Sequence, residues 1–263
     1  MTLPLKWHGG KWYLAPKIVA LMPLHTHYVE AYAGGLSVLL AKDPDGVSEV
    51  ANDIDGSLSN FWRVLQQEDT FARLLRVLEA VPFSEREWHK SRKRELTDPV
   101  ERAARFFINC RQSLAGRMAS FAPLSRTRTR RGMNEQASAW LSAIEGLPAV
   151  HARLKRVAIL NRDAIDVIRG EDGPATLFYL DPPYLKETRA AANVYAHEMP
   201  DDDHQSLLDV ITNCAGHVMI SGYRSALYDR LLATWTRHEF VLPNQAAGGK
   251  QKRRMTEVVW CNY

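Results

Sequence analysis

The sequence has little cysteine and no long apolar run, and both absences exclude classes of protein. Its 263 residues include 3 cysteines, Cys110, Cys214 and Cys261, which lie far apart in the chain. Their spacing matches no zinc site, and their odd number argues against a disulfide framework. No apolar run approaches the roughly 18 residues that a membrane-spanning helix needs, and the amino terminus lacks the apolar block of a signal peptide. We therefore expect a cytoplasmic protein that binds no metal.

The net charge is modest, but its distribution is uneven. The chain has 34 Lys and Arg against 30 Asp and Glu, which gives a formal charge of +4. Between Ser84 and Arg131, however, 13 basic residues face 5 acidic ones. A basic stretch of this kind neutralises phosphates, so we expect a nucleic acid as the partner.

The hydrophobic pattern predicts an α/β fold with an insertion. Short apolar segments that read as strands are followed by glycine or acidic residues, and helical periodicity dominates residues 57–150. We predict a mostly parallel, Rossmann-like sheet with an antiparallel terminal hairpin strand, including strands over residues 47–51, 157–160 and 238–242. An apolar helix is expected over residues 38–42. Residues 1–56 and 151–263 should form one domain, and residues 57–150 a mainly helical inserted domain.

The strand over residues 176–180 ends in Asp181-Pro182-Pro183-Tyr184. Open α/β sheets bind ligands at the carboxyl ends of their strands. The two prolines lack amide donors, and their carbonyls are left to accept hydrogen bonds. Acceptors beside a flat ring suit an amino group on a planar heterocycle. A strand that leaves a sheet through Asp-Pro is also common in proteins without a site there, so this stretch alone leaves both interpretations open.

Together with a glycine turn after an earlier strand, this stretch resembles the S-adenosylmethionine-dependent amino-methyltransferases, and more narrowly the Dam-type (D12 class) DNA adenine N6-methyltransferases. The run Lys6-Trp7-His8-Gly9-Gly10-Lys11 is similar to the family's amino-terminal run at each fixed position. The resemblance implies that Trp7 packs on the cofactor and that Lys11 contacts the cofactor or the target base. From the glycine pair alone, a flexible amino terminus with a core tryptophan is the alternative.

The resemblance also implies the rest of the cofactor site. The family's glycine turn has the pattern aromatic-x-Gly-x-Gly, and here Leu36 stands at the second glycine position. Asp53 follows the second strand, where a carboxylate receives the ribose hydroxyls. Asp163 matches the position that binds the cofactor's adenine amino group, although it also suits a helix cap. The implied cofactor-binding residues are Trp7, Lys11, Glu30, Gly34, Asp53, Asp163 and Asp181.

In this family the target-recognition domain is inserted between the second and third strands, where residues 57–150 fall. Arginines that alternate with small polar residues over residues 126–132 suit a loop along a nucleic-acid backbone. For any single arginine, a solvated loop is the alternative. The candidate DNA-binding residues are Arg111, Arg117, Arg126, Arg128, Arg130, Arg131, Lys252 and Arg253. The stretches associated with GATC recognition are absent, so the recognition sequence stays open.

The implied activity is site-specific methyl transfer to adenine N6 in DNA. Asp181 and the Pro182 carbonyl would accept the two amino hydrogens, so that the nitrogen lone pair points at the methyl group of S-adenosylmethionine, which is released as S-adenosylhomocysteine. The base would be extruded from double-stranded DNA, within a short recognition sequence, and stacked on Tyr184. No obligate protein partner is evident. Two alternatives stay open: transfer to cytosine N4 or RNA adenine, and a non-catalytic binder of cofactor and nucleic acid, which Leu36 favours.

Overall fold

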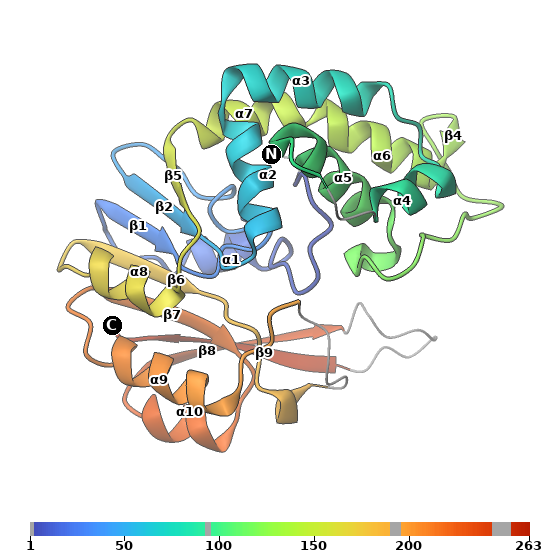
Figure 1. The fold of residues 1–263 in the computed structure, drawn as a ribbon. Helices are drawn as coiled ribbons and strands as arrows, with labels where there is room; N and C mark the ends of the chain where they lie inside the picture. Colours follow the sequence, from blue (N-terminus) through green and yellow to red (C-terminus); the bar gives the residue numbers. More distant parts are fainter. Residues whose placement is uncertain (1–2, 93–95, 190–195, 244–253) are drawn as a thin grey trace. The chain divides into compact units, whose positions relative to one another are not determined.

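Short, largely buried strands form a seven-stranded sheet (Figure 1). The computed structural model describes residues 3–92, 96–189, 196–243 and 254–263. The strand order is β5 (Val157–Leu160), β2 (Ser48–Asn52), β1 (His27–Glu30), β6 (Thr176–Leu180), β7 (His217–Gly222), β9 (Arg254–Cys261) and β8 (Thr236–Pro243). β1 is parallel to β2 and β6, and β6 is parallel to β7, whereas β9 is antiparallel to both of its neighbours. The expected mostly parallel sheet with an antiparallel terminal hairpin is therefore confirmed.

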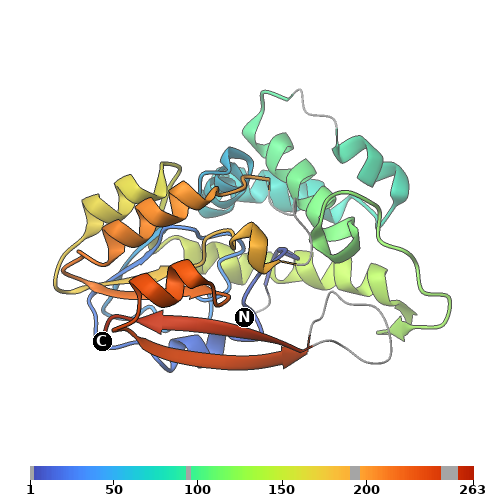
Figure 2. The ribbon, with the colours of Figure 1, turned by 90° about the horizontal axis from the view of Figure 1, so that it is seen from below.

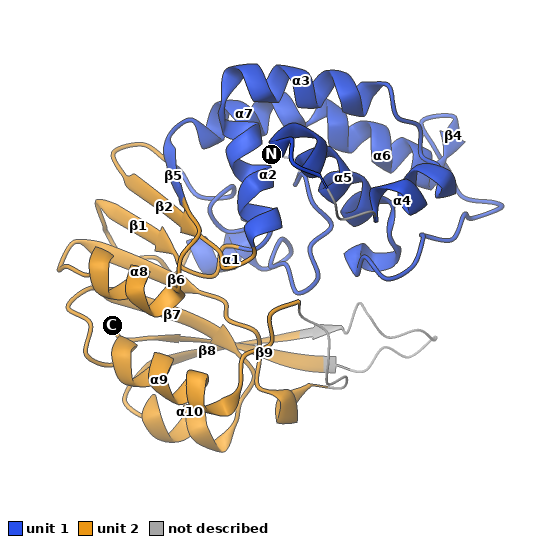
Figure 3. Cartoon of the chain, in the orientation of Figure 1, with its two compact units in different colours: residues 1–19, 34–43, 56–159 blue, residues 20–33, 44–55, 160–263 orange. Residues whose placement is uncertain are grey.

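The chain divides into two compact units (Figure 3). The first unit contains residues 1–19, 34–43 and 56–159, and the second contains residues 20–33, 44–55 and 160–263. The division cuts β5 after Ile159, and the other six strands of the sheet belong to the second unit. The assignment of residues 57–150 to a separate inserted domain stays a prediction.

In the second unit, three helices cover one apolar face of the sheet. These helices are α8 (Ala164–Glu171), α9 (Asp201–Ile211) and α10 (Ala226–Leu231), and Figure 2 shows α8 and α9 side by side. Successive strand residues point to opposite faces, so Val29, Phe178 and Trp260 lie together in this core. Burial of each large apolar side chain contributes about 1.5–3 kcal/mol, which fixes the strands on the helices.

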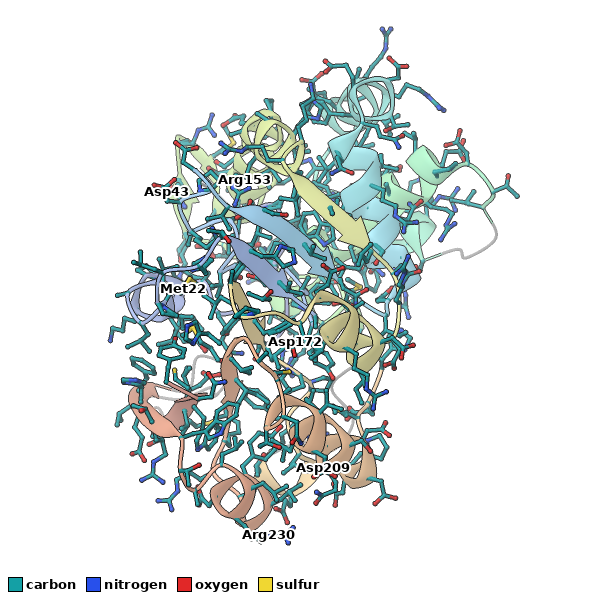
Figure 4. All side chains as sticks on the ribbon, turned by 90° about the vertical axis from the view of Figure 1, so that its left-hand side faces the viewer. Met22, Asp43, Arg153, Asp172, Asp209 and Arg230 are labelled. Atoms are coloured by element: carbon teal, nitrogen blue, oxygen red, sulfur yellow. The ribbon has the colours of Figure 1, made fainter. Side chains whose placement is uncertain are left out.

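The loop that leads into β7 is tied to the end of α8. The carboxylate of Asp172, labelled in Figure 4, accepts hydrogen bonds from the backbone amides of Ala215 and Gly216 at 2.9 and 3.0 Å. Because these bonds hold the start of β7, they help to set its position beside β6.

The opposite face of the sheet carries buried polar side chains. Tyr28 donates a hydrogen bond to Glu30 Oε1 at 2.7 Å, and the hydroxyl oxygens of Tyr179 and Ser221 are 2.9 Å apart. Glu257 of β9 is buried on the same face. Burial and the neighbouring Glu30 carboxylate raise the pKa of Tyr28, so its hydroxyl stays a donor. Buried ionisable groups are costly and gather at functional sites, so we expect this face to serve the site.

The first unit is mainly helical. Its helices are α1 (Ala15–Val19), α2 (Gly56–Gln66), α3 (Glu68–Glu79), α4 (Glu85–Ser91), α5 (Pro99–Gln112), α6 (Glu135–Glu145) and α7 (Leu147–Leu154). The side chain of Asp98 caps α5 by accepting hydrogen bonds from the amides of Val100 and Glu101. Phe61 of α2 stacks on Phe107 of α5 with ring centroids 5.6 Å apart. None of the helices in the described ranges is long and apolar enough to cross a membrane.

The prediction of a helix over residues 38–42 is wrong. The Leu40 amide reaches the Leu36 carbonyl and the Lys42 amide reaches the Val38 carbonyl, each at 3.0 Å, but the segment forms only turns. Gly34 and Leu36 have φ values of 48° and 55°, so a right-handed helix cannot extend back through these residues. Pro44 limits a helix on the carboxyl-terminal side, because proline has no backbone amide to donate. The apolar residues are therefore buried without a regular helix.

The buried ring of His204 should make stability depend on pH. Its Nδ1 lies 3.0 Å from the Tyr228 hydroxyl oxygen, and burial lowers the pKa of His204 to about 4, against the opposing effect of Asp201 and Asp203. The unfolded chain binds this proton more readily than the folded one. The protein should therefore lose stability as the pH falls from about 6.5 towards 4, by up to about 3 kcal/mol.

His204→Asn should remove this part of the pH dependence of the free energy of unfolding, measured by urea denaturation at several pH values. The control His197→Asn, at an exposed position, should retain it. If the free energy of unfolding of both variants varied with pH as in the wild type, the buried ring would be excluded as the source of the pH dependence.

Candidate active site

Four parallel strands of the second unit end at one edge of the sheet, and a polar residue stands at each end. Glu30 is the last residue of β1, Asp53 follows β2, Asp181 follows β6 and Tyr223 follows β7. Since β2, β1, β6 and β7 are parallel neighbours, their carboxyl ends lie at the same edge. The structure thus places three of the predicted cofactor residues, Glu30, Asp53 and Asp181, along one edge.

The loops at this edge are joined by Asn52, which no sequence motif singled out. Its buried side-chain amide donates hydrogen bonds to the carbonyls of Ala31 and Arg162 at 3.0 and 3.1 Å. The side-chain oxygen accepts from the Arg162 amide at 2.9 Å. Asn161 adds a further link by donating to the Asp53 carbonyl at 2.8 Å. Asn52 therefore holds together the loops that follow β1, β2 and β5.

Asn52→Ala should lower the free energy of unfolding by about 2–4 kcal/mol, because backbone groups of Ala31 and Arg162 lose their partner. Asn60→Ala is a matched control that removes one exposed hydrogen bond of 2.9 Å to the Pro99 carbonyl. We expect the control to lower the free energy of unfolding, measured by urea denaturation, by less than about 1 kcal/mol. Equal costs would contradict a bridging role for Asn52.

Two of the predicted cofactor carboxylates also hold the backbone. Asp53 Oδ1 accepts a hydrogen bond from the Asp55 amide at 2.9 Å. Asp163 caps α8, with Oδ1 accepting from the amides of Ile165 and Asp166 at 2.8 and 3.3 Å. A carboxylate has two oxygens, so capping is compatible with a ligand contact, which stays a prediction for both residues. Within the described ranges, no group of three or more His, Cys, Asp or Glu residues is arranged to hold a metal ion.

The three predicted catalytic residues lie in the turn after β6. Asp181 is half-buried, whereas Pro182 and Tyr184 are buried. Among the described residues, none donates a hydrogen bond to the Pro182 carbonyl. Burial raises the pKa of Tyr184, and the negative charges of Asp181 and Glu257 add to this effect. The hydroxyl of Tyr184 therefore remains protonated, and it donates a hydrogen bond to Glu257 Oε1.

In the first unit, the amino-terminal segment packs on the glycine turn. A Cβ added at Gly34 would lie 2.7 Å from Trp7 Nε1, and one added at Gly35 would lie 2.8 Å from Trp7 Cβ. Trp62 of α2 donates a hydrogen bond to the Gly34 carbonyl at 3.2 Å. Lys11 is buried, and its ammonium group donates to a backbone carbonyl of its own segment. A side chain at Gly34 or Gly35 would therefore clash with Trp7, which fills the space beside the turn.

Leu36, which stands where the resembled pattern has a glycine, takes a left-handed backbone conformation. Its φ is 55° and its side chain is fully buried. The left-handed conformation costs a leucine roughly 1–2 kcal/mol, which burial of the side chain, worth about 1.5–3 kcal/mol, offsets. The leucine is therefore compatible with a glycine-like turn.

Gly34→Ala and Gly46→Ala should separate the steric role of Gly34 from its backbone role. Both glycines have positive φ, but an added Cβ at Gly46 meets no atom within 4 Å. Gly46→Ala should cost about 1 kcal/mol for the backbone alone, and Gly34→Ala about 1–3 kcal/mol more because Trp7 must move. Equal losses in the free energy of unfolding, measured by urea denaturation, would show that the contact with Trp7 is not tight.

Two of the predicted DNA-binding arginines are held by the protein itself. Arg111 is half-buried and donates to the Ala139 carbonyl at 2.8 Å. Arg131 connects β3 (Thr129–Arg130) to β4 (Met133–Asn134) and forms two hydrogen bonds with Glu145, at 2.8 and 2.9 Å. Arg131 and Gly132 have φ values of 55° and 74°, as a two-residue type I′ hairpin turn requires. Arg131, which is itself exposed, thus links the hairpin to α6. Contact with DNA stays a prediction for Arg111 and Arg131.

The other predicted arginines of this unit, Arg117, Arg126, Arg128 and Arg130, are exposed. Arg128 lies 3.9 Å from Glu135, and the side chains of the remaining three form no hydrogen bond or ion pair with any described residue. Exposed guanidinium groups of this kind are suited to phosphates, so contact with DNA stays a prediction for them. Lys252 and Arg253 lie outside the described residues.

A protein family, a relative and a solved structure each match most of this chain. The family model described as D12 class N6 adenine-specific DNA methyltransferase matches residues 7–241. The Type II methyltransferase M1.LlaDCHI of Lactococcus lactis subsp. cremoris is 25% identical over 284 residues, which cover 98% of this chain and 94% of that protein. A crystal structure of the SAM-dependent methyltransferase from Agrobacterium tumefaciens matches with 11% identity and a TM-score of 0.40, over 95% of this chain and 59% of that one.

Proposed function

We propose that Asp181, Pro182 and Tyr184 hold an adenine of DNA while its N6 amino group is methylated. The premise is that the chain belongs to the D12 class N6 adenine-specific DNA methyltransferase family. The matched residues, 7–241, include all three. Methylation of adenine N6 in DNA is the activity of this family, and the chain is an enzyme of that class. The methyl donor is S-adenosylmethionine, which supplies a methyl group activated by a sulfonium.

The residues at the sheet edge fit this cofactor by their chemistry. Ribose hydroxyls and amino groups donate hydrogen bonds, and the sulfonium carries a positive charge, so carboxylates are suitable partners for all three groups. Glu30, Asp53 and Asp181 provide carboxylates along one edge. We assign the ribose hydroxyls to Asp53 and the cofactor's adenine amino group to Asp163. Trp7, Lys11 and Gly34, which the first unit brings together, are further proposed contacts.

The turn after β6 offers the acceptors that methyl transfer needs. The lone pair of an adenine amino group is delocalised into the ring, which makes the nitrogen a poor nucleophile. When Asp181 and the Pro182 carbonyl accept its two hydrogens, the nitrogen becomes pyramidal and its lone pair is directed at the methyl carbon. Transfer would form the bond between N6 and the methyl carbon while the bond from that carbon to the sulfonium sulfur breaks, which releases S-adenosylhomocysteine. One N6 proton would then pass to the proposed acceptor, Asp181. The Pro182 carbonyl supports this role because no described residue donates to it.

The target base must leave the DNA double helix to reach this turn. Enzymes that modify a base extrude it and stack it on an aromatic ring, and we assign this ring to Tyr184. Such stacking is worth about 1–3 kcal/mol. The exposed arginines Arg117, Arg126 and Arg130 are proposed to contact the phosphates, so DNA binding should weaken as salt rises.

The observation that carries the proposal is the position of Asp181-Pro182 at the carboxyl end of a strand flanked by parallel neighbours on both sides. The test is to incubate the enzyme with labelled S-adenosylmethionine and unmethylated double-stranded DNA, and to identify the labelled nucleoside after digestion. We expect N6-methyladenine. Labelled N4-methylcytosine or no labelled base would contradict the proposal.

Asp181→Ala should reduce turnover at least about a hundredfold, because an acceptor aimed at the reacting nitrogen is lost. Asp181→Asn keeps one acceptor oxygen and should be less impaired. Asp209→Ala, which removes an exposed carboxylate from α9, is the control and should leave turnover unchanged. A cooperative transition in urea denaturation would show that each variant is folded. Wild-type turnover in Asp181→Ala would remove this residue from the catalytic role.

A further inference from the structure

Glu257 is a buried carboxylate to which the proposed reaction assigns no part. β9 pairs antiparallel with β7, and the partner of Val258 is Gly222, the last residue of β7. Glu257 therefore stands at the carboxyl end of β7, on the polar face of the sheet, with 4% of its surface exposed. Burying a carboxylate is costly unless hydrogen bonds compensate, so its partners indicate its role.

One partner of Glu257 is the tyrosine of the catalytic turn. The Tyr184 hydroxyl donates a hydrogen bond to Glu257 Oε1 in the interior of the second unit. A bond from a hydroxyl to a carboxylate is charge-assisted and stronger than a neutral one. It joins the turn after β6 to β9, so the far end of the Tyr184 ring is tied to the sheet.

The ring of Tyr184 has a second support. The Tyr223 ring packs against it edge to face, with centroids 4.8 Å apart and an interplanar angle of 75°. The Tyr223 hydroxyl lies 3.8 Å from Met255 Sδ, so β9 also contacts this second ring. Edge-to-face aromatic pairs are favourable, and this one limits the tilt of the Tyr184 ring. Glu257 and Tyr223 thus hold Tyr184 at its hydroxyl and along its ring.

We propose that Glu257 is a positioning residue, which fixes the angle of the Tyr184 ring so that the stacked adenine presents its amino group correctly to Asp181 and Pro182. The inference rests on the proposed function, in which Tyr184 is the stacking surface. Glu257 acts through Tyr184 and touches neither the base nor the methyl donor. Its loss should lower the rate of transfer to DNA, because a misplaced amino group reacts slowly, without weakening the binding of S-adenosylmethionine.

The test is a double-mutant cycle on steady-state methylation of unmethylated DNA. Glu257→Ala and Tyr184→Phe should each lower kcat/KM for DNA about tenfold, with KM for S-adenosylmethionine within about twofold of wild type. The double variant should be no slower than the poorer single variant, because both changes remove the same bond. Glu257→Gln, whose amide oxygen still accepts from the hydroxyl, should recover most of the activity.

Glu239→Ala is the matched control, because Glu239 lies on the same hairpin with 41% of its side chain exposed and pairs with Arg237. It should behave as wild type. Where Glu257→Ala does not fold, Tyr184→Phe and Glu257→Gln carry the test: a slow Tyr184→Phe beside a near-normal Glu257→Gln supports the proposal, and wild-type activity of Tyr184→Phe overturns it.

The remaining outcomes separate this inference from the proposed function. Wild-type enzyme that forms N6-methyladenine, together with a Glu257→Ala variant as active as Glu239→Ala, overturns the inference alone. Losses that multiply in the double variant also overturn it. Wild-type enzyme that forms no N6-methyladenine overturns the proposed function, and the inference with it.

Discussion

The parallel alignment of β2, β1, β6 and β7 is the constraint on which the rest of the site depends. It brings the ends of strands that are far apart in the sequence to one edge, so that Glu30, Asp53 and Asp181 become neighbours along the sheet. The alignment is held by the apolar face, where α8, α9 and α10 pack on the strands. The polar face and the edge are thereby left for chemistry, and the family's reaction needs both acceptors and a ring at that edge.

Buried hydrogen bonds give this edge its detailed shape. Asn52 joins the loops after three strands, and Glu257 anchors the tyrosine of the catalytic turn. Such groups are costly to bury and stabilising only when every partner is present, so they define one arrangement of the loops. The same principle applies in the first unit, where Trp7 and Trp62 hold the turn at Gly34. The enzyme therefore relies on a framework of polar contacts for the placement of its carboxylates.

Much of the fold could be predicted from the sequence, because apolar strands followed by Gly, Asp or Pro have a strong local signal. The strand before Asp181 and the terminal hairpin are examples. The helix over residues 38–42 was wrong because its apolar content says nothing of the left-handed backbone at Leu36. Asn52 and Glu257 were missed because their partners are distant in the sequence and no local pattern marks them. Arg111 shows the same limit, since charge alone cannot distinguish an arginine that is partly buried and bonded to a backbone carbonyl from one that faces solvent.

Hydrogen exchange with and without S-adenosylhomocysteine tests most directly whether the strand ends form one cofactor site. Ligand contacts and ordered loops slow the exchange of nearby amides, so protection maps the site without a substrate. The account predicts protection over residues 31–33, 53–55, 161–166 and 181–185, the loops that follow β1, β2, β5 and β6, with little change in α10. Protection confined to other parts of the chain, with these four loops unchanged, would contradict it.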